Sequence, residues 1–232
     1  MSNIAMIEII ANALGALKEK VVFVGGSVAE LYADYPDISD IRTTTDVDCF
    51  LELHTYHNYS KLEEKLRKLG FKDDTTQGAP ICRKIYRGIK VDFMPNDEKV
   101  LGFSNRWYVD GIKNKKEVVL SNRTHVYILP VEYYLATKFE AMNNRGGTDI
   151  RGSYDWEDIV YIMNNCVELS NIINKCVNKL LVEYLREQCN LLLKNSNIRE
   201  IIYSSLPYKS EEENINKILE VMRSIFGLHK VN

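Results

Sequence analysis

The hydrophobic pattern of the chain changes near residue 128, and this change limits the folds that are open to it. Before it, short β-branched and aromatic runs alternate with helical stretches, whereas after Pro130 apolar residues recur mainly at helical spacing. Runs of strands followed by runs of helices are typical of α+β proteins. We therefore expect a mixed α+β fold, with residues 1–128 forming a sheet flanked by helices and residues 129–232 forming a helical domain.

The expected elements follow from local periodicity and from turn residues. Residues 2–17, 28–33 and 59–69 are predicted to be helical in the first part, and residues 34–44 a loop. The predicted strands cover residues 21–24, 46–51, 81–86, 89–93, 118–120 and 126–129, and Arg87-Gly88 is predicted to form the two-residue turn of a hairpin. In the second part, helices are predicted at residues 131–143, 153–165, 168–194 and 210–226, with a loop over 143–153.

Composition narrows the class of protein. Hydrophobic residues make up 45% and charged residues 27% of the chain, as in globular proteins, and the net charge of -2 argues against a general nucleic-acid coat. The five cysteines are odd in number and lack C-x-x-C spacing, so reduced, mostly buried thiols are expected rather than a disulfide framework or a zinc site. No basic leader and no apolar run of about 20 residues is present. These features predict a cytoplasmic protein without a membrane partner.

A glycine turn follows the first predicted strand. Gly25, Gly26 and Ser27 separate the apolar run Val21–Val24 from a short predicted helix. Glycines let the backbone approach a ligand closely, and free N–H groups at the start of a helix favour phosphate. On its own, such a turn is more often merely a tight connection.

Three acidic residues occupy predicted strands. Asp46 and Asp48 are two apart on a strand and therefore share a face, while Asp92 sits among apolar residues late in the predicted hairpin. Adjacent carboxylates repel each other, and a divalent cation with hard oxygen ligands, such as Mg²⁺, removes that repulsion. The alternatives are an exposed polar strand face for the pair and a plain strand-end carboxylate for Asp92.

Together these features resemble the nucleotidyltransferase superfamily of the DNA polymerase β type. The segment 24–27, followed by Arg42-Thr43-Thr44-Thr45-Asp46-Val47-Asp48, looks like the AbiEii/AbiGii-type group, which contains abortive-infection and toxin–antitoxin nucleotidyltransferases. The resemblance continues in residues 130–141, similar to the lysine-bearing helix of the family, and in Asp155-x-x-Asp158, similar to its later acidic motif. The spacing between Ser27 and Asp46 is longer than in the compact form of the motif.

The resemblance implies a site and a reaction. A nucleoside triphosphate (NTP) would bind with its phosphates over Gly25, Gly26 and Ser27, and Asp46 and Asp48 would hold Mg²⁺ or Mn²⁺. Asp92 would complete a second metal site and help to deprotonate the attacking hydroxyl. Lys138, Arg42 and Asp155 are the further nucleotide-binding candidates; their alternatives are a solvated helix lysine, a surface arginine and an acid that favours the helix dipole.

The acceptor stays open at the level of sequence. The leading hypothesis is transfer of a nucleoside monophosphate (NMP) to RNA, tRNA or a protein, by a toxin that has a cognate antitoxin. The alternatives are a small-molecule, antibiotic-type adenylyltransferase and a catalytically silent nucleotide-binding module. The stretch from Arg83 to Arg123 is basic and contains Trp107 and Tyr108, which suits RNA, although such runs are usually a solvated flank.

Overall fold

The computed structural model describes residues 1–36, 39–51, 56–95, 105–145, 149–208 and 210–227. It divides into two compact units. The sheet unit comprises Met1–Glu30 and Arg42–Pro130, and the helical unit comprises Leu31–Ile41 and Val131–Asn232. The segment 31–41 is joined to the helical unit by a hydrogen bond of 3.1 Å from the Asp34 N–H to the Asn165 carbonyl. The further assignment of a catalytic domain to residues 1–128 stays a prediction.

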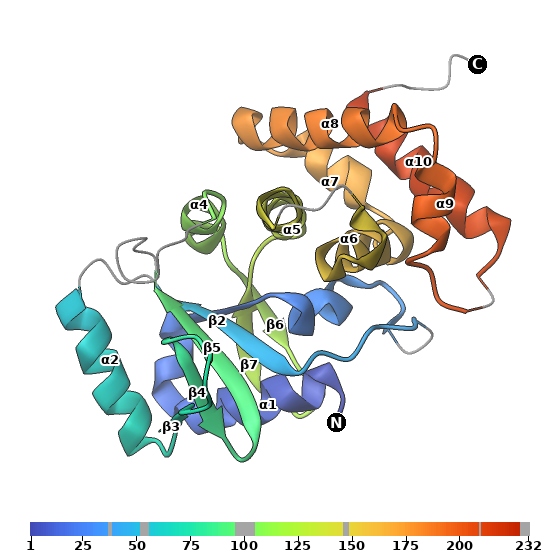
Figure 1. The fold of residues 1–232 in the computed structure, drawn as a ribbon. Coiled ribbons are helices and arrows are strands. Elements are labelled where there is room, and N and C mark those ends of the chain that lie inside the picture. The colour runs from blue at the N-terminus through green and yellow to red at the C-terminus, as the bar shows by residue number, and fades with distance from the viewer. Residues whose placement is uncertain (37–38, 52–55, 96–104, 146–148, 209, 228–232) are drawn as a thin grey trace. The chain divides into compact units, whose positions relative to one another are not determined.

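A mixed sheet forms the centre of the sheet unit (Figure 1). Its order among the described residues is β3-β4-β5-β2-β1-β7-β6. β2 is parallel to β5 and β1 to β7, and the remaining neighbours are antiparallel. The strands are β1 (Val21–Val24), β2 (Asp46–Leu51), β3 (Lys72–Asp73), β4 (Arg83–Tyr86), β5 (Ile89–Pro95), β6 (Lys116–Val119) and β7 (His125–Ile128).

The predicted hairpin is confirmed. Tyr86 pairs with Ile89 across Arg87 and Gly88, which have φ angles of 50° and 82°. Two consecutive residues with positive φ are typical of the type I′ turn, whose twist matches that of the flanking strands. The turn fixes the register of β4 on β5 and therefore decides which side chains face each other farther along.

The helices of the sheet unit depart from the predicted ones at their ends. They are α1 (Asn3–Leu14), η1 (Gly15–Lys20), α2 (Tyr56–Lys68) and α4 (Tyr108–Lys113), while η2 (Gly26–Tyr32) runs from this unit into the helical one. Ser2 caps α1 by accepting from the Ala5 N–H, as expected. The predicted helix over 2–17 was too long, because Gly15 has φ 54° and the chain continues as a 3₁₀ helix.

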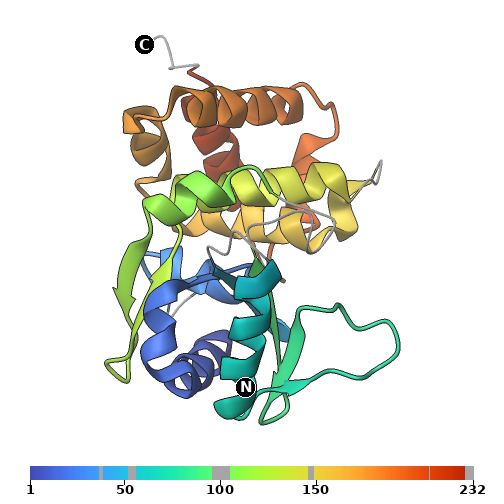
Figure 2. The ribbon, with the colours of Figure 1, turned by 90° about the vertical axis from the view of Figure 1, so that its left-hand side faces the viewer.

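A buried lysine ties α2 to the edge of the sheet. The side chain of Lys84 is 2% exposed, and its Nζ lies 2.7 Å from Glu63 Oε1 on α2 and 2.5 Å from Asp73 Oδ1 on β3. Burial opposes the charge of Lys84, but its hydrogen bonds to Asp73 and Glu63 outweigh this and raise the pKa of Lys84. Figures 1 and 2 show α2 beside these strands.

The helical unit is a bundle in which α8 and α10 pack together, and each also packs on α5 or α6. Its core includes Ile159, Leu185, Ile218 and Met222. The elements are α5 (Val131–Asn144), η4 (Ile150–Gly152), α6 (Tyr154–Asn165), α7 (Leu169–Lys175), α8 (Lys179–Leu193), α9 (Ile198–Tyr203) and α10 (Glu212–Phe226).

The single helix predicted over 168–194 is wrong. The structure has two helices there, because Cys176 is extended and Asn178 begins a new helix by accepting from the Leu181 N–H. Asparagine is among the strongest N-cap residues, and apolar periodicity continues across such a break. The periodic signal therefore hid a boundary that the cap residue marks.

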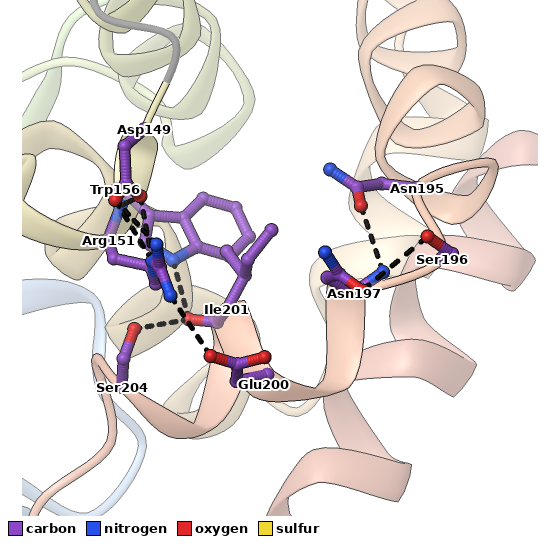
Figure 3. Close-up of polar contacts among 9 residues, drawn as sticks. All are labelled: Asp149, Arg151, Trp156, Asn195, Ser196, Asn197, Glu200, Ile201 and Ser204. Carbon is purple, nitrogen blue, oxygen red and sulfur yellow. Dashed lines mark hydrogen bonds and ion pairs between the residues drawn. The ribbon is translucent and has the colours of Figure 1, made fainter.

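A polar network fastens the start of α6 to α9 (Figure 3). Trp156, which is fully buried, donates from its indole N–H to the Ile201 carbonyl at 3.1 Å, and Ser204 Oγ donates to the same oxygen at 2.9 Å. Arg151 bridges Asp149 and Glu200 at 2.7 and 3.0 Å. Because a buried indole N–H needs a partner, the Trp156 bond fixes α9 in place.

In the part of the chain that the structure describes, no helix has the length and apolar character needed to cross a membrane.

The thiols give a direct test of the packing. Cys49, Cys82, Cys166 and Cys189 are buried, and burial raises the pKa of Cys82 to about 11 and that of Cys189 to about 12. Cys176 is half-buried. Since the thiolate is the reactive form, we expect an aromatic disulfide reagent at neutral pH to modify Cys176 alone in the native protein, and slowly. Modification of all five cysteines should follow unfolding; two fast native thiols would contradict the packing.

Candidate active site

Four strands bring the predicted acidic residues into one row. Val24 on β1 pairs with Asp48 on β2, Asp48 pairs with Asp92 on β5, and Asp92 pairs with Arg83 on β4. Residues opposite each other in a sheet project from the same face. Asp46, two residues before Asp48, shares that face as predicted. The row thus gathers three carboxylates and one guanidinium on one side of the sheet.

Gly25 is packed directly against Asp48. It has φ 73°, and a Cβ atom at this position would lie 1.9 Å from Asp48 Oδ2. No L-residue with a side chain fits there without displacing the carboxylate. The glycine turn therefore serves to let Asp48 approach the backbone after β1, which is a more specific role than a tight connection.

Arg83 bridges two of the three carboxylates. Its Nε donates to Asp92 Oδ1 at 2.7 Å, and one terminal nitrogen donates both to Asp92 Oδ2 at 2.7 Å and to Asp46 Oδ2 at 3.0 Å. The side chains of Arg83 and Asp92 are only 18% and 11% exposed. The hydrogen bonds to Asp92 raise the pKa of the guanidinium, and the charges of Asp92, Asp46 and Asp48 add to this effect.

The same carboxylates act on buried thiols nearby. Burial is the main reason why the pKa of Cys49 and that of Cys82 are raised, and the charges of Asp48 and Asp92 raise both further. The row gathers three carboxylates and one guanidinium, which agrees with the direction of both shifts.

Ser27 and Arg42 both take part in hydrogen bonds within the fold. Ser27 is 1% exposed, and its hydroxyl donates to the Val24 carbonyl at 3.4 Å, so it closes the turn internally. Arg42 is half-buried, and its carbonyl accepts from Asn3 at 2.9 Å. Gly26 begins η2. Binding of nucleotide by these residues stays a prediction.

Lys138 and Asp155 lie in a second charged cluster, within the helical unit. Lys138 on α5 is buried, and its Nζ lies 2.6 Å from Asp158 Oδ2 and 3.3 Å from Asp155 Oδ1, both on α6. Arg145 also pairs with Asp155, at 2.7 Å. Lys138 is thus not a solvated lysine, and Asp155 is not the cap of α6, a role that Ser153 fills by accepting from the Trp156 N–H. The nucleotide-binding role of both stays a prediction.

The residues of the row fit a divalent cation by their chemistry. Carboxylate oxygens are the ligands that Mg²⁺ and Mn²⁺ prefer, and Gly25 leaves Asp48 room beside the backbone. In the described part of the chain, however, no three His, Cys, Asp or Glu side chains are already gathered as a metal-binding group. Arg83 instead occupies the position between Asp46 and Asp92. The carboxylates are thus suitable ligands for a metal, but in this structure Asp46 and Asp92 are paired with Arg83.

Arg83 is a member of the site that was not predicted from the sequence, where it belongs to the basic stretch from Arg83 to Arg123, here called the basic strip. Arg83 and Lys84 are held in ion pairs on opposite faces of β4, and Trp107 is 7% exposed. Lys99, within the same stretch, lies outside the described residues. Among the described residues of the strip, the other lysines and arginines are therefore the ones that could contact a partner. Binding of RNA by the strip stays a prediction.

Replacement of Gly25 tests the contact with Asp48. We expect Gly25→Ala to lower the free energy of unfolding by about 2 kcal/mol, because the methyl group must push Asp48 away and the residue must keep a positive φ. Chemical denaturation measures this change. Gly152→Ala is the control, since a Cβ there meets nothing within 4 Å, and it should change stability by only a few tenths of a kcal/mol. Equal stability of the two variants would contradict the close approach.

The buried cluster of the helical unit predicts a second stability effect. Lys138→Met should lower the free energy of unfolding by about 3 kcal/mol, because Asp155 and Asp158 lose their shared counter-charge while 2% exposed. The added change Asp158→Asn should restore part of the loss by removing one buried charge. Lys175→Met, at an exposed position, is the matched control. A loss that Asp158→Asn makes worse would show that charge is not the cause.

Comparison with known proteins places the fold. No protein-family model and no curated protein matches the sequence. The structure is similar to that of an antigenic nucleotidyltransferase-like protein from Paracoccidioides brasiliensis, with a TM-score of 0.51 and 16% sequence identity over 88% of this chain and 94% of that chain. At this identity the likeness concerns the fold alone. It confirms the predicted fold class: the chain has the mixed α+β fold of a nucleotidyltransferase-like protein.

Proposed function

We propose that the protein is a metal-dependent nucleotidyltransferase that moves an NMP from an NTP to a hydroxyl of a macromolecule, RNA or protein. The observation that carries the proposal is the row Val24–Asp48–Asp92 together with Asp46, on one sheet face beside the glycine turn. The sequence motifs and the fold support the same class. Because a fold alone does not imply a function, the proposal depends mainly on the three carboxylates.

In the proposed reaction the acceptor hydroxyl oxygen attacks the α-phosphorus of the NTP. A new P–O bond forms, the bond from the α-phosphorus to the bridging oxygen breaks, and pyrophosphate leaves. Asp46 and Asp48 would hold Mg²⁺ or Mn²⁺, with Asp92 completing the set. The metal, when bound, supplies positive charge to the phosphate oxygens and to the attacking and leaving oxygens.

The chain's own residues position these groups. Gly25 leaves room for the Asp48 carboxylate directly beside the backbone, since a Cβ atom at this position would lie 1.9 Å from Asp48 Oδ2. Asp92 is the proposed acceptor of the hydroxyl proton; Arg83 pairs with both of its oxygens in the metal-free protein, so Asp92 takes up this role once Arg83 has moved away. A carboxylate that already lies in place, as Asp48 does, loses little freedom when substrate binds, and such preorganisation lowers the barrier.

The motif resemblance supports a more specific biological role. We propose that the enzyme belongs to the AbiEii/AbiGii-type group and acts as the toxin of a toxin–antitoxin or abortive-infection system, held in check by a cognate antitoxin. The nucleotide would also be contacted by Gly26, Ser27, Arg42, Lys138 and Asp155. These assignments rest on the motifs at residues 24–27, 42–48, 130–141 and 155–158.

Incubation with each α-³²P-labelled NTP, Mg²⁺ and total cellular RNA tests the proposal. We expect label in RNA or in protein, and a loss on the order of a thousandfold in Asp48→Asn, because a metal-binding carboxylate supplies several kcal/mol of transition-state stabilisation. Asp110→Asn is the control, since Asp110 is an exposed acid on α4 that pairs with Lys113. The control should keep full activity.

The other outcomes separate the competing functions. Label that appears only on an added aminoglycoside would mean a small-molecule adenylyltransferase. Nucleotide binding without pyrophosphate release, whichever acceptor is supplied, would mean a silent nucleotide-binding module. Transfer that persists in Asp48→Asn would exclude this row of carboxylates as the active site.

A further inference from the structure

Arg83 pairs with two of the carboxylates, Asp46 and Asp92, that a metal ion at this site would need. One terminal nitrogen of its guanidinium lies 3.0 Å from Asp46 Oδ2 and 2.7 Å from Asp92 Oδ2. A Mg²⁺ ion binds carboxylate oxygens at about 2.1 Å. Arg83 therefore already uses the two carboxylate oxygens that a cation held by Asp46 and Asp92 would need, so the guanidinium and a metal compete for the same ligands.

The pairing is strong enough to matter for metal affinity. Both oxygens of Asp92 accept from Arg83, which is the two-pronged geometry of the strongest ion pairs between arginine and carboxylate. Asp92 is 8% exposed as a residue, so water competes little for these bonds. A metal must replace several charge-assisted hydrogen bonds before it gains its own ligands.

Arg83 also differs from Lys90, another cation on this face. Lys90 lies opposite Asp46 in the parallel register of β2 and β5, and opposite Ile85 on β4, so it shares the face of the row. Its side chain is exposed. Lys90 thus adds positive charge beside the carboxylates but does not have the bridging position of Arg83.

We propose that Arg83 is a built-in counter-ion that keeps Asp46 and Asp92 closed to divalent cations, and that a metal enters this site only by displacing it. The inference rests on the proposed function, in that it takes these carboxylates as the metal ligands. It gives Arg83 a regulatory part: the free energy of its ion pairs sets how much metal the resting protein binds. Arg83 is a positioning residue here, since it acts through the two aspartates.

Metal binding by the whole 232-residue chain without nucleotide tests this inference. The probe is Mn²⁺, with its free concentration followed by electron paramagnetic resonance. We expect Arg83→Gln to bind Mn²⁺ about ten- to a hundredfold more tightly than the unaltered protein, the range that corresponds to one charge-assisted hydrogen-bonded pair. Lys90→Gln, which removes the same charge from the same face, should change the affinity by less than about threefold, as expected for an exposed charge.

Two further variants locate the effect. Adding Asp46→Asn to Arg83→Gln should cancel the gain, because it removes one of the two released ligands. Arg83→Lys keeps the charge but cannot form the two-pronged pair, and it should show a smaller gain in the same direction. If Arg83→Gln does not fold, Arg83→Lys provides the same comparison. Circular dichroism and a Mn²⁺-dependent rise in melting temperature, larger in the variants than in the unaltered protein, give independent readouts.

Several results would overturn the inference. Equal Mn²⁺ affinity of the unaltered protein and both Arg83 variants would show that no competition exists. Absence of Mn²⁺ binding even after Arg83 is replaced would show that the carboxylates are no metal site. An equal gain in Lys90→Gln would reduce the effect to general charge.

These measurements are separate from the test of the proposed function. A gain in Mn²⁺ affinity in a protein without transfer activity would support the role of Arg83 and count against the enzyme. Transfer activity, together with a Mn²⁺ affinity that replacing Arg83 does not change, would support the enzyme and count against the role of Arg83.

Discussion

Repulsion among Asp46, Asp48 and Asp92 is the constraint on which the sheet unit depends. Three carboxylates on one face, two of them directly opposite each other on β2 and β5, would destabilise that face unless positive charge lay among them. Arg83 supplies it from β4 through contacts of 2.7–3.0 Å. This face is thereby stable without a bound cation, and the register of β4 on β5 makes this possible.

Part of this arrangement could be predicted from the sequence. The hairpin turn at Arg87-Gly88 fixes the pair Tyr86 and Ile89, and each step away from the turn adds one residue on either strand, so Arg83 must face Asp92. The turn was predicted, but Arg83 was expected to be one of the surface charges of the basic strip. The net charge of a stretch of sequence does not show which charged side chains lie opposite each other; the strand register does.

Other parts depend on contacts that no local pattern encodes. The pairing of Asp48 with Asp92 requires β2 and β5 to be parallel neighbours, and they lie about 40 residues apart in the chain. The short elements β3, α4 and α9 were missed because two to six residues carry too little periodicity. The glycine turn was identified, but its contact with Asp48 follows only from the antiparallel pairing of β1 with β2.

Both units contain cationic side chains that are held in ion pairs. The net charge of the sequence is therefore a poor guide to how strongly the protein attracts a charged partner. Arg83 and Lys84 in the sheet unit and Lys138 in the helical unit neutralise carboxylates of the chain itself. The positive charge of these three residues is therefore largely neutralised within the fold. A polyanion such as RNA would therefore be attracted by exposed residues such as Lys116 and Arg123, at β6 and the turn that follows it. The near-zero net charge conceals this division between internal and surface charge, and electrostatic attraction of an acceptor depends on the surface charge alone.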